Sequence, residues 1–303
     1  MMKVIRKCLK VQFLKVFMTW VDTKRLKKQN DPIEDLIILR DIPYVQDGHP
    51  LQRLDILSQK DGLWNMPTII NIHGGGLIYG DTELNQNFNA EYARRGFKVI
   101  SLSYRLLPND TFDAQIKDIL VALSFIHTNA QTYSINTHEV YITGDSAGAL
   151  LTLFAVALSK NEALRSLFDV TDPNIHIKGM GLISTMLDIA ERKDIIDYAP
   201  LLVLRGKNHS ASQYIYNPSK LVEVVDFPPC FMVTSREDFI RQDTLKLKRL
   251  FDQFKLPCEL LDWGKGDAYP LNHVFPVTYP KVKESQKTID AMIDFFNTVN
   301  IVL

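Results

Sequence analysis

Ser146 is the residue best placed for nucleophilic chemistry, because Gly144 and Gly148 flank it in the pattern Gly-x-Ser-x-Gly. The β-branched and aromatic run 139–143 predicts a buried strand before it, and the run 149–158 predicts a helix after it. A strand–turn–helix of this kind holds a serine in a strained turn, and the glycines let the strand and the helix pack closely. The pattern alone is a weak signal, so the interpretation of Ser146 as a nucleophile depends on its partners.

A glycine-rich loop that could bind a developing negative charge begins at His73, directly after the predicted strand 67–72. Three consecutive glycines are costly in backbone entropy, which indicates a loop where backbone N–H groups approach another group closely. In acyl transfer that group is the oxyanion of the tetrahedral intermediate. A phosphate-binding loop fits less well, because the Lys-Ser/Thr pair that it normally carries is absent here. We expect the oxyanion to be bound by the N–H groups of Gly75, Gly76 and Ala147, with Gly74 as an alternative donor.

A carboxylate and a histidine that could activate Ser146 come later in the chain, near the ends of the last predicted strands. Asp238 could orient a histidine and offset the charge of its imidazolium, and Glu237 and Asp243 are the rival acids. His273 follows the last predicted strand and a glycine-bearing loop, and we expect it to act as the base. No spacing such as His-Glu-x-x-His occurs, so we expect neither a metal nor an organic cofactor.

Four side chains adjoin these candidate catalytic residues in the sequence. We expect the substrate pocket near the reacting centre to be lined by Leu77, Tyr79, Val274 and Phe275. The run 103–108 is a strand end that leaves into a loop closed by a proline. It carries no catalytic group, and we expect it to support the structure.

The elements that must position these residues alternate between strand and helix along most of the chain. Residues 36–45 and 51–57 flank an Asp-Gly turn signal and predict an antiparallel hairpin. Further strands are predicted over 67–72, 98–104, 139–143, 178–184, 229–235 and 258–263, and helices over 83–96, 114–127, 149–158, 245–254 and 285–299. This alternation predicts an α/β fold with a mainly parallel sheet and helices on both faces. We expect residues 1–303 to form a single domain.

The N-terminal segment 4–21 predicts an amphipathic helix with lysines opposite its apolar residues. Those apolar residues are Ile5, Leu9, Phe13, Val16, Phe17 and Trp20. We favour a helix that packs this face on the body of the protein, and the alternative is a basic helix that rests on a membrane surface.

Composition and charge narrow the classes of partner. The 303 residues carry no formal net charge, which gives no general case for nucleic acid as a partner. The charge is uneven, however, because residues 1–28 sum to +8 and the remainder to −8. Three cysteines without paired spacing favour a reducing compartment. We expect no signal peptide, because Lys10 and Lys15 interrupt the apolar residues of the basic N-terminus and no small-residue cleavage site follows. We therefore expect a cytoplasmic protein.

These motifs together resemble the α/β-hydrolase esterases of the hormone-sensitive-lipase-like group. The resemblance covers residues from about 67 to 276 and is carried by the motifs 73–76, 104–108 and 144–148, by Asp238 and by His273. It implies a twisted sheet of eight strands, a helical cap built from residues 1–45 and 185–226, and hydrolysis of short-chain carboxylic esters by a Ser–His–Asp triad. Members of this group often form dimers, so a homodimer is possible.

Two other functions are compatible with the same residues. A deacetylase of acetylated sugars or an amidase acting on a small amide would use the same triad with a different cap. A ligand-binding protein on an inactive hydrolase scaffold would usually have lost a member of the triad, and Ser146, Asp238 and His273 are all present.

Overall fold

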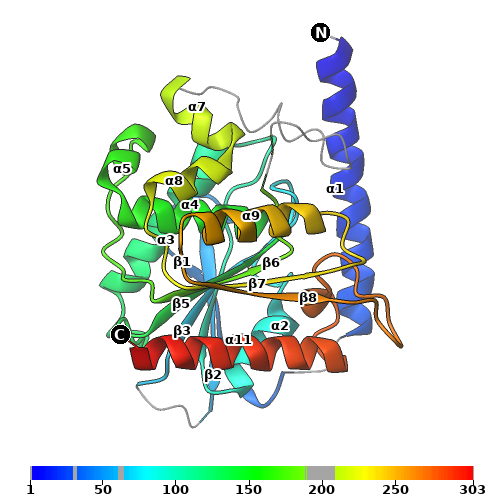
Figure 1. The fold of residues 1–303 in the computed structure, drawn as a ribbon, viewed down its shortest axis with the longest axis vertical. Helices are drawn as coiled ribbons and strands as arrows, with labels where there is room; N and C mark the ends of the chain where they lie inside the picture. Colours follow the sequence, from blue (N-terminus) through cyan, green and yellow to red (C-terminus); the bar gives the residue numbers. More distant parts are fainter. Residues whose placement is uncertain (1, 30–32, 61–64, 188, 190–208, 303) are drawn as a thin grey trace.

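The computed structural model describes residues 2–29, 33–60, 65–187, 189 and 209–302. Eight strands in these ranges form one sheet in the order β1-β2-β4-β3-β5-β6-β7-β8 (Figure 1). The strands are β1 (Leu36–Pro43), β2 (Arg53–Gln59), β3 (Thr68–Ile72), β4 (Lys98–Leu102), β5 (Val140–Asp145), β6 (Gly179–Ile183), β7 (Cys230–Ser235) and β8 (Cys258–Trp263). β1 pairs antiparallel with β2, and β2 pairs antiparallel with β4. The other neighbours pair parallel, which confirms the predicted hairpin and the mainly parallel sheet.

Helices cover both faces of this sheet. They are α1 (Met2–Lys28), α2 (Gln86–Arg94), α3 (Phe112–Thr128), α4 (Ala147–Lys160), α5 (Glu162–Phe168), α7 (His209–Tyr216), α8 (Leu221–Val224), α9 (Arg241–Gln253), α10 (Phe275–Thr278) and α11 (Lys283–Val302), with a 3₁₀ turn at Pro218–Lys220. Among the described residues, only the consecutive helices α4 and α5 taken together, bent by 116°, have the length and apolar character of a membrane span.

Two apolar clusters lie on opposite sides of the strands and account for the layers seen in Figure 1. One cluster joins the sheet to α3, α4 and α9, and the other joins it to α2 and α11. The central strands β3, β4 and β5 are buried along their whole length, as expected for parallel strands covered on both faces. Because β3, β4 and β5 run parallel, their carboxyl ends meet at one edge of the sheet, where ligands bind in folds of this kind.

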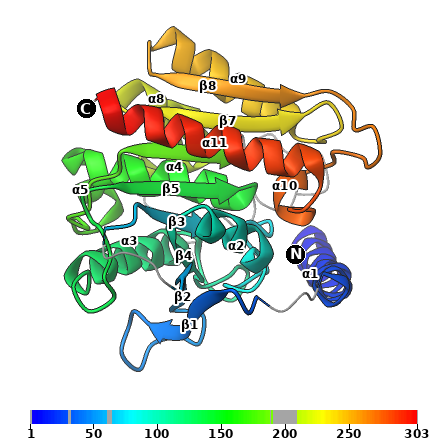
Figure 2. The ribbon, with the colours of Figure 1, turned by 90° about the horizontal axis from the view of Figure 1, so that it is seen from below.

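The prediction that residues 1–45 belong to a cap is wrong for the C-terminal part of that segment. Leu36–Pro43 is strand β1 at the edge of the sheet, because its residues complete the hydrogen bonding of β2. Within the described residues of this segment, α1 is the helix that lies outside the sheet, and Figure 2 shows it at the periphery beside α10. Within the other expected cap segment, 188 and 190–208 lie outside the described residues, and 209–224 holds α7 and α8 near α5 and α4.

Helix α1 packs on the body through a different face from the one that we expected. Val11 and Leu14 are buried and Met18 packs against the core. The expected core residues Phe13, Val16, Phe17 and Trp20 are each at least half exposed, whereas the side chains of Ile5 and Leu9 lie outside the described residues. The physical reason is that apolar residues occupy more than one side of this helix, and only one side can contact the body.

Candidate active site

Ser146 lies at a strained turn between β5 and α4, as the strand–turn–helix pattern predicts. Its backbone has φ 53° and ψ −116°, a conformation that residues with a side chain rarely adopt. A Cβ atom on Gly148 would lie 2.1 Å from the carbonyl oxygen of Ile72, and one on Gly144 would lie 2.5 Å from the carbonyl oxygen of Gly148. Both flanking glycines are therefore required by close packing of backbone on backbone.

The structure brings Ser146, His273 and Asp238 into one line of hydrogen bonds. The Ser146 hydroxyl donates to Nε2 of His273 over 2.9 Å, and Nδ1 of His273 donates to Oδ1 of Asp238 over 2.8 Å. The serine comes from the start of α4, whereas the acid and the histidine follow β7 and β8. This arrangement can remove the proton from the serine hydroxyl while it stabilises the resulting imidazolium.

Asp238 is held in its charged form despite its burial. Burial alone would raise the pKa of the carboxyl group, but hydrogen bonds from His273, Ser184 and the backbone N–H of Ile240 bring the net pKa below its usual value. Thr234 also donates its hydroxyl to Oδ2 over 3.2 Å. The carboxylate is thus fixed on every side, and it presents Oδ1 to the histidine.

The two rival acids serve the backbone instead of His273. Oε2 of Glu237 accepts hydrogen bonds from the N–H groups of Gly266 and Leu271, so Glu237 shapes the loop that leads to the histidine. Oδ2 of Asp243 accepts the N–H of Leu187. Their sequence positions alone did not distinguish these carboxylates from Asp238.

The glycine-rich loop is oriented by the residues behind it. Nδ1 of His73 donates to the carbonyl oxygen of Gly74 over 2.7 Å, and the Tyr104 ring stacks on His73 at 4.5 Å between centroids. In a trans peptide the C=O and the following N–H point in opposite directions, so the N–H of Gly75 points away from His73. Gly75 and Gly76 both line the cavity beside Ser146. The structural role expected for the segment around Tyr104 agrees with these contacts.

Gly74 is not available as the alternative donor to an oxyanion. Its N–H donates to Oδ1 of Asp145 over 3.1 Å, and the side chain of Asn85 donates to the same oxygen over 2.7 Å. Neither Asp145 nor Asn85 was predicted from the sequence, although Asp145 stands next to the serine in the motif. Burial raises the pKa of the Asp145 carboxyl from its usual 3.8 to about 6. Asp145 therefore joins the turn at Ser146 to the glycine-rich loop.

A cavity of about 340 Å³ opens at Ser146 and His273. Of the four side chains expected to line it, Tyr79 and Val274 do so. Leu77 and Phe275 do not, because Leu77 is fully buried in the core and Phe275 is buried against Trp263. Residues adjacent in sequence to a catalytic group point to different sides of their turns, so sequence proximity alone did not place them in the pocket.

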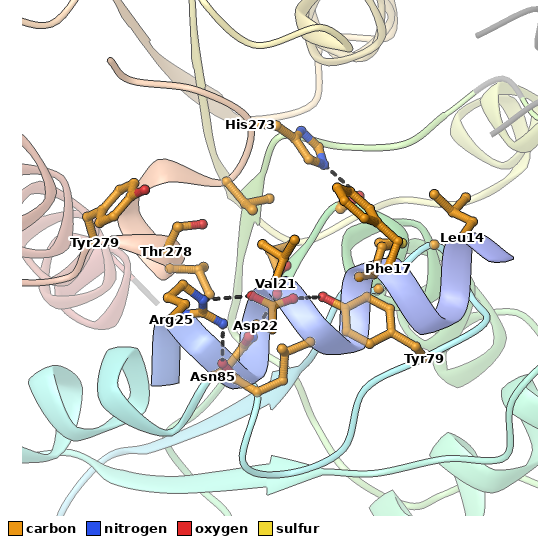
Figure 3. Close-up of a pocket in the computed structure, with 18 of the residues that line it drawn as sticks. Leu14, Phe17, Val21, Asp22, Arg25, Tyr79, Asn85, His273, Thr278 and Tyr279 are labelled. Atoms are coloured by element: carbon orange, nitrogen blue, oxygen red, sulfur yellow. Dashed lines mark hydrogen bonds and ion pairs between the residues drawn. The ribbon is translucent and has the colours of Figure 1, made fainter. Parts of the chain in front are cut away.

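Helix α1 contributes to this cavity through a side that the sequence analysis did not identify. Leu14, Phe17, Met18, Val21, Asp22 and Arg25 all line it. Figure 3 shows Asp22 between Arg25 and Tyr79: it accepts the Tyr79 hydroxyl, and Nε of Arg25 donates to it over 2.7 Å. Arg25 also donates to the carbonyl oxygen of Leu84 over 3.2 Å. These polar contacts fix α1 against the body and place charged groups at the far end of the cavity.

Among the residues that the structure describes, no group of three or more His, Cys, Asp or Glu side chains is arranged to hold a metal ion.

Comparison with known proteins places the chain in a family. The family model described as BD-FAE matches residues 54–239, which is more than half of the chain and includes Ser146 and Asp238. The chain belongs to the BD-FAE family. Among curated proteins, it is similar to an acetyl esterase of Salmonella typhi, with 25% identity over 204 residues that cover 63% of this chain. The match spans 61% of that relative's length.

Solved structures resemble this member of the BD-FAE family over almost its whole length. Esterase B from Lactobacillus Rhamnosis has a TM-score of 0.92 and 27% identity, with 99% of this chain and 96% of that chain covered. A hyperthermophilic esterase from Pyrobaculum calidifontis has a TM-score of 0.73 and 17% identity, covering 96% of this chain and 92% of that chain. The likeness to these folds confirms the predicted α/β-hydrolase fold and the resemblance to its esterases.

Proposed function

We propose that this protein is a serine carboxylesterase that hydrolyses short-chain acyl esters through an acyl-enzyme intermediate. The observation that carries the proposal is the line of hydrogen bonds from Ser146 through His273 to Asp238, beside a cavity lined by Gly75 and Gly76. The names of the similar proteins, an acetyl esterase and an esterase B, support the same class of reaction.

In the first half of the reaction, Oγ of Ser146 attacks the ester carbonyl carbon while Nε2 of His273 takes the hydroxyl proton. The carbonyl π electrons move onto oxygen, and the backbone N–H groups of Gly75, Gly76 and Ala147 bind the oxyanion. Ala147 is the first residue of α4, so the helix itself offers its N–H no acceptor. The C–O bond to the alcohol then breaks, and His273 returns the proton to the leaving oxygen.

In the second half, water attacks the acyl-serine carbon while His273 takes a proton from the water. The second tetrahedral intermediate collapses, the carboxylic acid leaves, and the proton returns to Oγ of Ser146. Asp238 keeps the imidazole in the required tautomer through both halves. Loss of one oxyanion donor in such a site typically lowers turnover by about 10²–10³.

The size of the cavity supports small acyl groups. Its volume of about 340 Å³ is near the lower end of the range for small-molecule sites, roughly 300–1,000 Å³. One structure of the Lactobacillus esterase B, with a TM-score of 0.88 and 26% identity, was inhibited by a C4-C4 SN3 tributyrin phosphonate. We therefore propose that short acyl chains are preferred, because the site is small.

The test is the turnover of a series of p-nitrophenyl esters, from acetate to a long acyl chain, by the wild type and by Ser146→Ala. We expect the wild type to hydrolyse the short esters and Ser146→Ala to lose about 10⁴-fold or more in kcat. Ser159→Ala is the matched control, because its hydroxyl donates to the carbonyl of Ala155 on the same helix. It should retain full activity.

Wild-type protein without activity on any of these esters would refute the esterase proposal. Activity on an acetylated sugar that exceeds activity on simple aryl esters would instead favour the deacetylase. An equal rate for Ser146→Ala and the wild type would show that the nucleophile lies elsewhere.

A further inference from the structure

An exposed stripe of aromatic and basic residues runs along α1. Its members recur at alternating spacings of three and four residues, which places them on one face of the helix. We define this aromatic–basic stripe as Lys10, Phe13, Phe17, Trp20, Lys24 and Lys27. All six side chains are exposed, with 73% of Phe13 and 54% of Trp20 accessible.

Most of the stripe lies on a different side of α1 from the residues that attach the helix to the body, and Phe17 is at the boundary between the two sides. Val11 and Leu14, on the other side of the helix, are buried in the core. Figure 2 shows α1 at the periphery of the molecule. Within the stripe the rings of Phe17 and Trp20 stack at 6.4 Å between centroids, and Nζ of Lys24 lies 3.7 Å from the centre of the Trp20 ring. The rings of Phe17 and Trp20 thus form an apolar surface that is open to solvent, and Phe13 on the same face of the helix is exposed as well.

This surface is continuous with the mouth of the catalytic cavity. Phe17 belongs both to the stripe and to the lining of the cavity. Three further apolar side chains line the cavity and are at least 40% exposed: Val21, Phe239 and Tyr279. Phe239 lies at 4.6 Å, centre to centre, from the ring of His273. An apolar surface placed against the stripe would therefore also cover the entrance to Ser146.

We propose that the aromatic–basic stripe docks on an anionic lipid surface and presents the mouth of the cavity to it. The order of residues fits that partner, because three aromatic side chains lie between Lys10 at one end and Lys24 and Lys27 at the other. Aromatic rings enter the boundary between headgroups and acyl chains, while lysines extend to anionic headgroups. Esters dissolved in the lipid would then reach the serine without crossing water. This last consequence rests on the proposed function, whereas the docking itself does not.

A second copy of the chain fits the same face less well. Alternating spacings of three and four also describe a coiled-coil seam, but such a seam requires apolar residues at its repeating positions. Here Lys10, Lys24 and Lys27 occupy three of the six positions, and two copies would bring like charges together. The charge of the stripe therefore favours an anionic partner over itself.

The test is flotation of the full chain with vesicles of ether-linked phosphatidylcholine, with and without ether-linked phosphatidylglycerol. Ether lipids contain no carboxylic ester, so binding is measured independently of hydrolysis. We expect binding only to the anionic vesicles, weaker at high salt because the lysine–headgroup attraction is screened. Lys24→Gln combined with Lys27→Gln should lower the partition coefficient by roughly 25-fold, about fivefold for each lysine.

Substitution of the aromatic residues distinguishes binding through the stripe from non-specific hydrophobic binding. Phe13→Ser combined with Trp20→Ser should lower the partition coefficient at least about tenfold. Val121→Ser combined with Val224→Ser is the matched control, since these apolar side chains are about 40% exposed on α3 and α8. An equal loss in the control would overturn the proposal, as would wild-type protein that does not float with anionic vesicles.

Sedimentation of the same proteins without lipid tests whether a second copy of the chain, and not lipid, binds to the stripe. If the wild type forms a dimer that Phe13→Ser with Trp20→Ser dissociates, the stripe is an interface between copies and the lipid proposal is wrong. Lipid binding by a chain that hydrolyses no ester would retain the docking surface and reject only the proposed function.

Discussion

Asp238→Asn removes one charge from the proposed triad while leaving its geometry in place. Oδ1 of Asp238 accepts both Nδ1 of His273 over 2.8 Å and the N–H of Ile240 over 3.0 Å. In the variant these two donors hold the amide with its oxygen in the same position. The hydroxyl of Thr234, which donates to Oδ2, can rotate to accept the new amide N–H. We therefore expect the histidine to keep its tautomer and orientation.

The loss of activity should then equal the loss of one charge–charge attraction in the transition state. Two unit charges at about 4 Å attract by ~4 kcal/mol at an effective dielectric constant of 20. That free energy corresponds to roughly a 10³-fold fall in kcat/KM. We expect Asp238→Ala to lose more, because it also removes the oxygen that fixes the tautomer of His273.

The assay is kcat/KM on a short p-nitrophenyl ester at neutral pH for both variants and for Glu237→Gln. Glu237→Gln is the matched control, because the same chemical change one residue away leaves an oxygen for the N–H groups of Gly266 and Leu271. It should stay within about threefold of the wild type, as expected for a group outside the reacting centre. A loss below tenfold in Asp238→Asn would refute the electrostatic role of Asp238. Equal losses in Asp238→Asn and Asp238→Ala would refute the retained orientation.

Two further predictions concern the turn that carries the serine. Because the pKa of Asp145 is raised in the folded state from its usual 3.8 to about 6, folding favours its protonated form, and the contribution of Asp145 to stability should fall as pH rises through this window. As the pH rises from 4 to 7, the free energy of unfolding of Asp145→Asn, measured with urea, should therefore increase by about 3 kcal/mol relative to that of the wild type. A difference between the two proteins that does not change with pH would contradict this. Gly148→Ala should lower the free energy of unfolding by about 3 kcal/mol and abolish esterase activity, since its Cβ would lie 2.1 Å from the carbonyl oxygen of Ile72. Gly264→Ala, whose Cβ would meet nothing within 4 Å, is the control for thermal unfolding, and equal effects of the two substitutions would disprove the steric argument.

The sequence by itself determined the order of the elements and the positions of the candidate chemical groups. The turn at Ser146, the glycine-rich loop and the alternation of strand and helix are local patterns, because they depend on residues a few positions apart. The position of His273 after the last strand could also be read from chain order. Local patterns therefore predicted the fold and the turn that carries the candidate nucleophile Ser146.

Only the tertiary structure decided which carboxylate faces His273. Asp238, Glu237 and Asp243 lie within a few residues of one another, and the contacts that distinguish them are made with His273, Gly266 and Leu187, each 25 or more residues away in the chain. The same limit applies to Asp145, whose partners Gly74 and Asn85 lie at least 60 residues earlier.

The orientation of α1 likewise depends on tertiary contacts. Apolar residues lie on more than one side of this helix, so its hydrophobic pattern alone does not select the side that packs. The side with Val11 and Leu14 packs, because Asp22 and Arg25 on the same side find partners in Tyr79 and Leu84. A helix packs through the side whose apolar groups are buried and whose polar groups are satisfied together, and both conditions depend on the rest of the chain.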